Sequence, residues 1–294
     1  MAGRFGAVVT AMVTPFRDDL SLDVDGAQEL VRHLLDHGSD TVLVAGSTGE
    51  SPTLTHDEKR DLFRAAVEAA EGRGRIWCGT GTYSTAESVE LTAMAQEAGA
   101  DAVLVVTPYY NKPPQRGIVA HFTEIARSTE LPIIAYNIPG RTATRIEHDT
   151  LLELAAVPNI VAVKDSTGDF DGASGLVREA PPGFEVYSGD DWATFGLVCL
   201  GAVGVVSVAS HLVGERIHQM VALIGDGDVP AARKVHEELS PLFKALFITS
   251  NPIPLKAALE LVGRPVGPPR LPLVPATPDE RAILRRALED AGLL

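Results

Sequence analysis

The sequence predicts an α/β fold, a (β/α)8 TIM barrel followed by a C-terminal helical extension. Short runs rich in Val, Ile and Ala alternate with longer segments of helical periodicity, and eight such runs occur. Parallel strands buried on both faces have this composition. The runs begin near Ala7, Thr41, Ile76, Ala102, Ile133, Ile160, Glu185 and Val203. Eight successive βα units favour a closed barrel.

The segments between the runs carry the start and stop signals of helices. Thr55 with Glu58, and Ser84 with Glu87, have the spacing of a capping box, in which two residues exchange hydrogen bonds at the first helical turn. A glycine, the usual residue after a last helical turn, follows three of the expected helices, at Gly38, Gly72 and Gly99.

An open, doubly wound sheet is the competing architecture. Such a sheet usually carries a glycine-rich first turn that binds a dinucleotide. The first turn here, residues 14–17, reads Thr-Pro-Phe-Arg, and the Gly-Thr-Gly at residues 79–81 lacks the third glycine of the motif. The barrel is therefore favoured, and nucleotide binding is not expected.

Two parts of the chain are predicted, a catalytic barrel over residues 1–224 and a helical extension over residues 225–294. The extension contains helical patterns at 229–249 and 253–261, a proline-rich connector at 265–278 and a last helix that ends near Ala291. The connector lies too close to the C-terminus to separate further domains. We therefore expect the extension to pack on the barrel.

Charge and composition exclude several classes of partner. Lys and Arg number 25 against 39 Asp and Glu, and the net charge of −14 would repel nucleic acids and anionic membranes. No run approaches the roughly 18 apolar residues of a membrane span. The apolar run at 5–16 imitates a signal peptide, but Pro15 interrupts it and we interpret it as the first strand. The two cysteines, Cys78 and Cys199, lack paired spacing, which indicates a reducing, cytoplasmic compartment.

Lys164 is the first candidate for chemistry. In a (β/α)8 barrel the active site lies at the C-terminal ends of the strands, and Lys164 closes the sixth apolar run. Desolvation in the barrel mouth disfavours the ammonium and lowers its pKa. A neutral amine can condense with a ketone to form a Schiff base. The alternative is a lysine that extends to solvent or pairs with Asp165.

Hydroxyl groups at neighbouring strand ends strengthen this interpretation. Tyr136 ends the fifth run, and Ser47 and Thr48 follow the second. Schiff-base chemistry needs several proton transfers, which a phenol with a hydroxyl neighbour can relay. Tyr109 and Tyr110 follow the fourth run, where packing in the core or in an interface is an equal alternative.

Other chemistry is less well supported. Arg141 has the geometry to fork onto a substrate carboxylate, or it forms a surface ion pair. His33 and His37 stand one helical turn apart without a third metal ligand. No nucleophile-elbow motif occurs. Asp190 and Asp191 resemble a metal pair, but Asp191 is better explained as the N-cap of a helix at 192–200.

Six motifs together resemble the dihydrodipicolinate synthase / N-acetylneuraminate lyase family, from about residue 5 to the C-terminus. They are Gly-Ser-Thr-Gly-Glu-Ser at 46–51, Thr-Pro-Tyr-Tyr-Asn-Lys-Pro at 107–113, Tyr-Asn-Ile-Pro-Gly-Arg-Thr at 136–142, Val-Lys-Asp at 163–165, Ser-Gly-Asp-Asp at 188–191 and Asn-Pro-Ile-Pro-Leu-Lys at 251–256. The order of the motifs is that of the family.

The resemblance implies a class I, metal-free lyase that needs no cofactor. In this family Lys164 would form a Schiff base with pyruvate, and Tyr136 would move protons. The Tyr pair and the Arg of the third motif mark the synthase branch. That branch condenses pyruvate with L-aspartate 4-semialdehyde to give 4-hydroxy-tetrahydrodipicolinate, in the diaminopimelate and lysine pathway.

The resemblance also assigns binding residues. Arg141 would hold the carboxylate of the semialdehyde, and Thr48 with the backbones of Gly189 and Val206 would hold pyruvate. Tyr110 would reach into the site of a neighbouring subunit, which implies a homotetramer built from tight dimers.

Three positions depart from the family pattern. The relay hydroxyl that is Thr in most synthases is Ser47, as in the aldolase branch. Members inhibited by lysine carry a His where this chain has Lys59 and an Asn where it has Tyr83, so we expect weak or no lysine feedback. Ser47 alone supports the alternative of a pyruvate-dependent aldolase for a 2-keto-3-deoxy sugar acid or a sialic acid. A catalytically silent ligand-binding protein is the third hypothesis.

Overall fold

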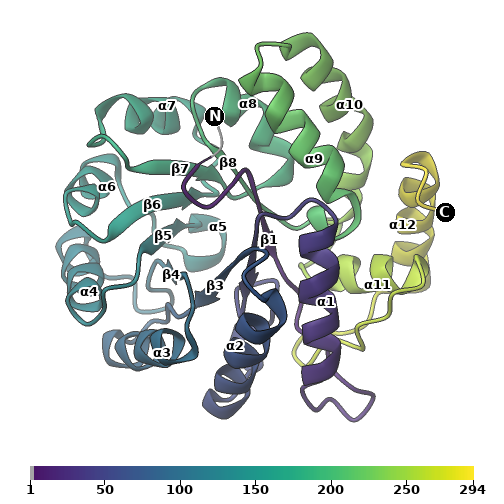
Figure 1. The fold of residues 1–294 in the computed structure, drawn as a ribbon, viewed down its shortest axis with the longest axis horizontal. Helices are drawn as coiled ribbons and strands as arrows, with labels where there is room; N and C mark the ends of the chain where they lie inside the picture. The colour runs from purple at the N-terminus through teal and green to yellow at the C-terminus, as the bar shows by residue number, and fades with distance from the viewer. Residues whose placement is uncertain (1–2) are drawn as a thin grey trace.

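The computed structural model describes residues 3–294 and confirms the barrel. Eight parallel strands close in chain order, with helices around them (Figure 1). Each strand begins within one residue of its expected start. The strands are β1 (Val8–Ala11), β2 (Thr41–Val44), β3 (Arg75–Gly79), β4 (Ala102–Val106), β5 (Ile133–Asn137), β6 (Ile160–Asp165), β7 (Glu185–Ser188) and β8 (Gly204–Ser207).

Helices or short 3₁₀ turns follow the strands. They are α1 (Val24–Asp36), η1 (Ser51–Thr53), α2 (His56–Ala70), α3 (Thr85–Ala98), α4 (Gln115–Arg127), α5 (Pro139–Thr142), α6 (His148–Ala155), α7 (Phe170–Glu179), η2 (Asp191–Ala193), α8 (Thr194–Cys199) and α9 (Ser210–Gly225). All three expected glycine stops adopt positive φ, at Gly38, Gly72 and Gly99.

One of the two predicted capping boxes is complete. At α2 the Thr55 hydroxyl accepts from the Glu58 N–H while the Glu58 carboxylate accepts from the Thr55 N–H. At α3 only half of the box forms. The Ser84 hydroxyl accepts from the Glu87 N–H, but the Glu87 carboxylate turns to His56, 3.3 Å away. The contact with His56, on another helix, therefore replaces the local hydrogen bond that would complete the capping box.

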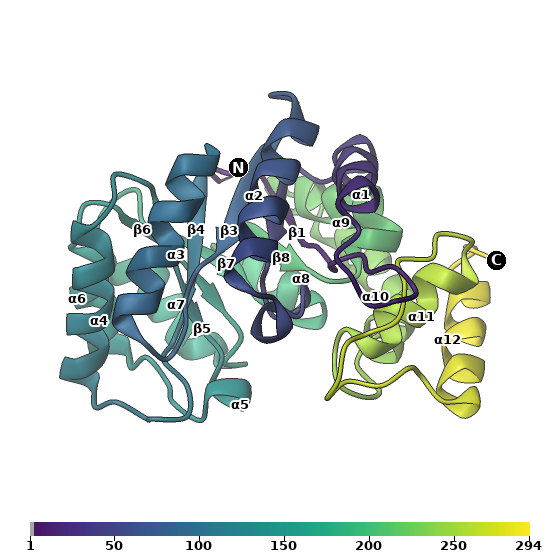
Figure 2. The same ribbon diagram turned by 90° about the horizontal axis from the view of Figure 1, so that it is seen from below.

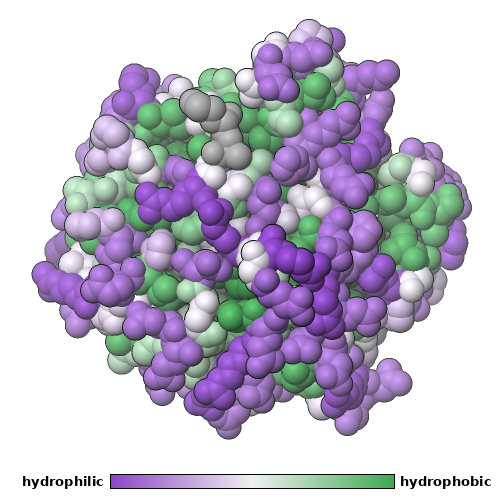
Figure 3. Space-filling model, viewed as in Figure 1, coloured by the Kyte–Doolittle hydropathy of each residue, from purple (hydrophilic) through white to green (hydrophobic). Residues whose placement is uncertain are grey.

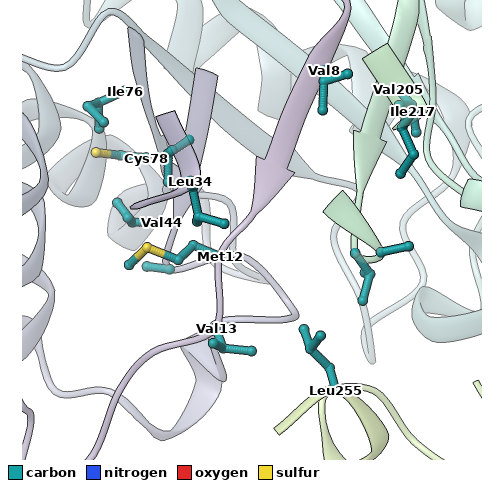
Figure 4. Close-up of a cluster of buried hydrophobic side chains, with 14 of the residues drawn as sticks. Val8, Met12, Val13, Leu34, Val44, Ile76, Cys78, Val205, Ile217 and Leu255 are labelled. Atoms are coloured by element: carbon teal, nitrogen blue, oxygen red, sulfur yellow. The ribbon is translucent and has the colours of Figure 1, made fainter. Parts of the chain in front are cut away.

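The apolar core has two layers, as expected for strands buried on both faces. The inner layer fills the barrel and includes Trp77, whose ring meets Tyr187 edge to face at 5.7 Å. The outer layer lies between the strands and the helices, where Figure 4 shows Leu34 of α1 beside Val44 of β2 and Met12. These layers leave only the ends of the strands for polar chemistry.

The C-terminal extension is helical and lies beside the barrel, next to α1 and α9 (Figure 2). It consists of α10 (Val229–Ala245), α11 (Ile253–Leu261) and α12 (Pro278–Asp290). The helix expected over 229–249 ends at Ala245. Apolar residues at 246–248 continue the periodic pattern past the true end, but the chain turns there toward α11.

Polar and charged side chains cover most of the face shown in Figure 3, with smaller apolar areas between them. Within residues 3–294, no helix combines the length and the apolar composition needed to cross a membrane. Cys78 is buried and Cys199 is exposed, and both are free thiols.

Candidate active site

Lys164 points from β6 into the mouth of the barrel. Its side chain is buried, with 5% of the residue exposed, and it forms no ion pair with Asp165 among the described residues. The Asp165 carboxylate instead accepts from the N–H and hydroxyl of Thr167. Burial lowers the pKa of Lys164 to about 8; the negative charge of Asp190 opposes this shift and the positive charge of Arg141 adds to it. A substantial fraction of neutral amine is therefore present near neutral pH.

Tyr136 lies directly against Lys164. The two residues are register partners on β5 and β6, and the Lys164 Nζ is 4.1 Å from the centre of the Tyr136 ring. Thr107 fixes the backbone there by donating its N–H and its hydroxyl to the Tyr136 carbonyl. Burial raises the pKa of the Tyr136 phenol, and hydrogen bonding toward Ser166 and Ser47 acts in the opposite direction. The phenol is a neutral proton donor beside the amine.

Gly189 and Val206 bring backbone to the same mouth. A side chain at Gly189 would meet the Ser166 Oγ at 2.0 Å, so glycine is required for the close approach of these two loops. The Gly189 N–H already donates to the Asp165 carbonyl, at 2.7 Å. Val206 is buried in β8, opposite Val9. The Gly189 N–H is therefore already occupied by the Asp165 carbonyl.

Asp191 corrects a prediction. It is not the N-cap of a helix at 192–200, because it lies inside η2. Its carboxylate accepts hydrogen bonds from the Ser207 hydroxyl and from the N–H groups of Val208 and Ala209. The side chain thus ties the loop after β7 to the loop after β8. Within residues 3–294, His, Cys, Asp and Glu form no group of three or more arranged to hold a metal.

Sequence reasoning did not assign Ser166 or Asp190 to the site. Ser166 directly follows β6, and its buried Oγ lacks a partner of ordinary hydrogen-bond geometry among the described residues. Burial raises the pKa of Asp190, while the nearby Lys164 ammonium lowers it. Both residues follow the C-terminal end of a strand, and this position alone would have predicted them as site residues.

The C-terminal extension reaches the site through Asn251. Its Nδ2 donates to the Thr48 Oγ1 at 2.8 Å, and its backbone carbonyl accepts from the Arg141 Nη2 at 3.4 Å. Arg141, in α5, forms no ion pair among residues 3–294, so its charge is free to meet an anion. The two predicted anion-binding side chains therefore share one neighbour.

A buried ion pair holds the extension to the loop after β2. The Lys256 Nζ of α11 lies 2.7 Å from the Glu50 Oε1, and both side chains are almost fully buried. The backbone N–H of Arg270 donates to the other Glu50 oxygen. The Phe16 ring lies 4.4 Å from the Lys256 ammonium and 4.1 Å from the Arg270 guanidinium. Two of the six sequence motifs meet in this cluster.

Tyr110 does not join the other candidates within its own subunit. It is 90% exposed and adopts a φ of 69°. Tyr109 is partly buried, with its ring edge to face against Tyr83 at 5.3 Å, and the Asn111 side chain donates to the Tyr83 carbonyl. The structure thus places Lys164, Tyr136, Ser47, Thr48, Arg141, Gly189 and Val206 at one mouth, and it places Tyr110 outside it.

Lys59 lies in a separate cluster behind this loop. It is buried in α2, and burial lowers its pKa while the Glu87 carboxylate acts in the opposite direction. The Glu87 carboxylate near Lys59 is already in contact with His56.

The fold and the site define a (β/α)8-barrel protein with a buried lysine and tyrosine at its C-terminal mouth. A family model described as the dihydrodipicolinate synthetase family matches residues 4–291, and the chain belongs to this family. A 4-hydroxy-tetrahydrodipicolinate synthase of Moorella thermoacetica is 52% identical over 291 residues, which are 99% of this chain and all of that protein.

Solved structures agree with this assignment. A Cyanidioschyzon merolae dihydrodipicolinate synthase with lysine bound has a TM-score of 0.98 and 46% identity, over 99% of this chain and all of that one. A dihydrodipicolinate synthase variant described as monomeric has a TM-score of 0.95 and 40% identity, over 98% of this chain and 97% of that one. Both similarities extend over the C-terminal helices as well as the barrel.

Proposed function

We propose that the chain is a 4-hydroxy-tetrahydrodipicolinate synthase, a lyase that condenses pyruvate with L-aspartate 4-semialdehyde in diaminopimelate and lysine biosynthesis. The observation that carries this proposal is the buried Lys164 amine, with its pKa lowered to about 8, against the neutral Tyr136 phenol. The curated relatives bear this enzyme's name. The aldolase alternative has only Ser47 in its favour.

The reaction begins on Lys164. Its neutral amine attacks the ketone carbon of pyruvate, and loss of water gives the imine. Loss of a proton from the pyruvate methyl group gives an enamine, whose carbon attacks the aldehyde carbon of the semialdehyde. The amino group of the semialdehyde then attacks the imine carbon and expels Lys164, which closes the ring. This route uses a covalent intermediate and no metal or organic cofactor.

Tyr136 and Ser47 serve the proton transfers of this route. Water loss needs a proton on the leaving hydroxyl, and carbon–carbon bond formation needs a proton on the new alkoxide. A phenol kept neutral by burial supplies both, and in this proposal the Ser47 hydroxyl, which is near enough to influence the pKa of the phenol, returns the proton to it. Thr48 and the backbones of Gly189 and Val206 bind pyruvate in this proposal, and Arg141 binds the semialdehyde carboxylate.

We also propose a homotetramer made of tight dimers. The exposed Tyr110 supports it, because a tyrosine held outward by an unusual backbone conformation is suited to enter a neighbour's site. Trp192 and Leu200, which precede and follow α8, are further exposed apolar side chains. The monomeric variant among the solved structures means that the association must be measured.

Two further proposals concern organisation. Residues 1–224 form the catalytic barrel and residues 225–294 the extension, with Asn251 and Lys256 as the contacts that join them. A cytoplasmic location is supported by the two free thiols.

The direct test uses purified protein with pyruvate and L-aspartate 4-semialdehyde, each omitted in turn. Formation of the heterocyclic product only when both are present supports the synthase. If no product forms but borohydride still traps pyruvate on the protein, the Schiff-base chemistry stands and the second substrate belongs to the aldolase branch. If neither occurs, the silent-protein hypothesis is favoured.

A further inference from the structure

We propose that Asn251 is a positioning residue that fixes the direction of the Thr48 hydroxyl, so that its O–H donates to the carboxylate of bound pyruvate. The inference rests on the proposed function and deepens it. Asn251 lies in the C-terminal extension, far from Thr48 in sequence, and the barrel strands alone do not supply this contact.

The direction follows from the hydrogen-bonding capacity of the two groups. An amide NH₂ only donates, and a hydroxyl oxygen can accept one bond and donate another. Because the Asn251 Nδ2 donates to the Thr48 Oγ1 at 2.8 Å, the hydroxyl proton must point elsewhere. Within residues 3–294 that proton has no acceptor, although Thr48 is only 3% exposed. The buried hydroxyl is thus left with a free donor at the mouth of the barrel.

The same residue aligns the second anion-binding group. The backbone carbonyl of Asn251 accepts from the Arg141 Nη2 at 3.4 Å, so the side chain of this residue contacts the hydroxyl and its backbone contacts the guanidinium. Pyruvate and the semialdehyde each carry a carboxylate. A single fixed residue between two donors sets the spacing at which both carboxylates are held.

Packing alone does not explain an asparagine here. The residue is 5% exposed, and its Oδ1 has no donor among the described residues. A buried acceptor without a partner costs free energy that an apolar side chain of similar size would avoid. The amide is therefore retained for what its NH₂ does to Thr48.

The position of Asn251 is rigid. It lies one residue before Pro252, the N-cap of α11, and Lys256 of this helix pairs with Glu50, two residues after Thr48 in the loop after β2. Two contacts thus join the start of α11 to the loop after β2: the Lys256–Glu50 ion pair and the hydrogen bond from Asn251 to Thr48. A donor held in this way loses little freedom when the ligand binds.

The test compares Asn251→Asp, Asn251→Ala and Thr48→Val by their KM for pyruvate, kcat and labelling by pyruvate with cyanoborohydride. Asp has the shape of Asn but only accepts, so it takes the Thr48 proton and repels the carboxylate. We expect Asn251→Asp to raise the KM for pyruvate by about tenfold or more, the effect of a lost hydrogen bond to a charged group. Asn251→Ala frees the hydroxyl to rotate and should cost less than Asn251→Asp.

This order separates positioning from structure, because a packing role predicts that the smaller Ala is the worse substitution. Thr48→Val removes the donor and should raise the KM for pyruvate more than Asn251→Ala does, and the double variant Asn251→Ala/Thr48→Val should be no worse than Thr48→Val. Thermal unfolding of each variant checks that it is folded. If Asn251→Asp does not fold, Asn251→Ala must still raise the KM for pyruvate, and its loss must vanish in the Thr48→Val background.

A KM for pyruvate within twofold of wild type in Asn251→Asp, or losses that add in the double variant, overturn the inference. The proposed function is tested separately by the unmodified protein. If pyruvate does not label the wild type, both proposals fail. If pyruvate labels the wild type and Asn251→Asp equally at low concentration, only the role of Asn251 is wrong.

Discussion

The Lys164 Nζ lies 4.1 Å from the centre of the Tyr136 ring, on adjacent strands whose register pairs the two residues. The face of an aromatic ring attracts an ammonium, whereas burial disfavours it. Burial prevails, and the pKa of Lys164 falls to about 8. Nucleophile and proton donor are thus placed together by the barrel itself.

The activity should rise with pH through about pH 8. Only the neutral amine attacks pyruvate, so kcat/KM for pyruvate should increase as the Lys164 ammonium loses its proton and level off about one unit above its pKa. A profile measured with wild-type protein checks this. The range from pH 6 to pH 9 extends from about two units below the Lys164 pKa to about one unit above it. Activity that is constant over this range contradicts the assigned pKa.

Two substitutions shift that profile in opposite directions. Asp190 raises the pKa of Lys164, so Asp190→Asn should move the rise to lower pH; Arg141 lowers it, so Arg141→Met should move the rise to higher pH. Asp191 also raises it, and its many hydrogen bonds make it unsuitable for this test. Arg141→Lys keeps the charge and is the matched control, with an unshifted profile. Shifts of the same sign in both variants would be inconsistent with charge control.

Ser47→Thr should retain or raise turnover. Serine has the relay oxygen but lacks the methyl group that restricts χ1, so the threonine should hold the hydroxyl toward Tyr136 more of the time. Steady-state kinetics with both substrates measures this, and Ser47→Ala, which removes the oxygen, is the control with a large loss. A large loss in Ser47→Thr would show that the assigned relay role is wrong.

Free lysine should inhibit weakly or not at all. The family resemblance puts Lys59 where inhibited members carry a His, and the cation of Lys59 would repel the ammonium of a bound lysine. The nearby Glu87 carboxylate is already in contact with His56. Turnover is measured against lysine concentration, with Lys59→His as the comparison variant. Half-inhibition of wild type at sub-millimolar lysine refutes the expectation.

Lys256→Met should destabilise the fold by about 3–5 kcal/mol, because it leaves the Glu50 carboxylate buried without its counter-charge. The double variant Glu50→Gln/Lys256→Met removes both charges and should recover much of this loss. Denaturant unfolding at one fixed protein concentration measures the three free energies. A double variant less stable than Lys256→Met contradicts the interpretation of a buried pair.

The barrel was predictable because each strand carries a short apolar run, whose limits depend on local composition. Lys164 and Tyr136 were predictable for a related reason, since a polar residue at the end of such a run has to face the mouth. Ser166 and Asp190 also follow strand ends, so the same reasoning would have placed them at the mouth, but they were not predicted as site residues.

Contacts between distant segments could not be predicted. The bond from Asn251 to Thr48 spans 203 residues, and nothing in the composition near either residue indicates it. The half-formed box at Ser84 has a similar cause, because Glu87 finds His56 on another helix. In the proposed tetramer, the outward Tyr110 lies in an interface that one subunit does not contain.

The central claim is that Lys164 carries pyruvate as an imine. The most direct measurement is borohydride reduction in the presence of pyruvate, followed by mass spectrometry of the digested protein, for wild type and Lys164→Arg. A guanidinium cannot form the imine, so we predict one reduced pyruvate on the peptide that contains Lys164, and neither label nor turnover in the variant. Label on another residue, or turnover of Lys164→Arg within about tenfold of wild type, a difference of only about 1.4 kcal/mol, would contradict the claim.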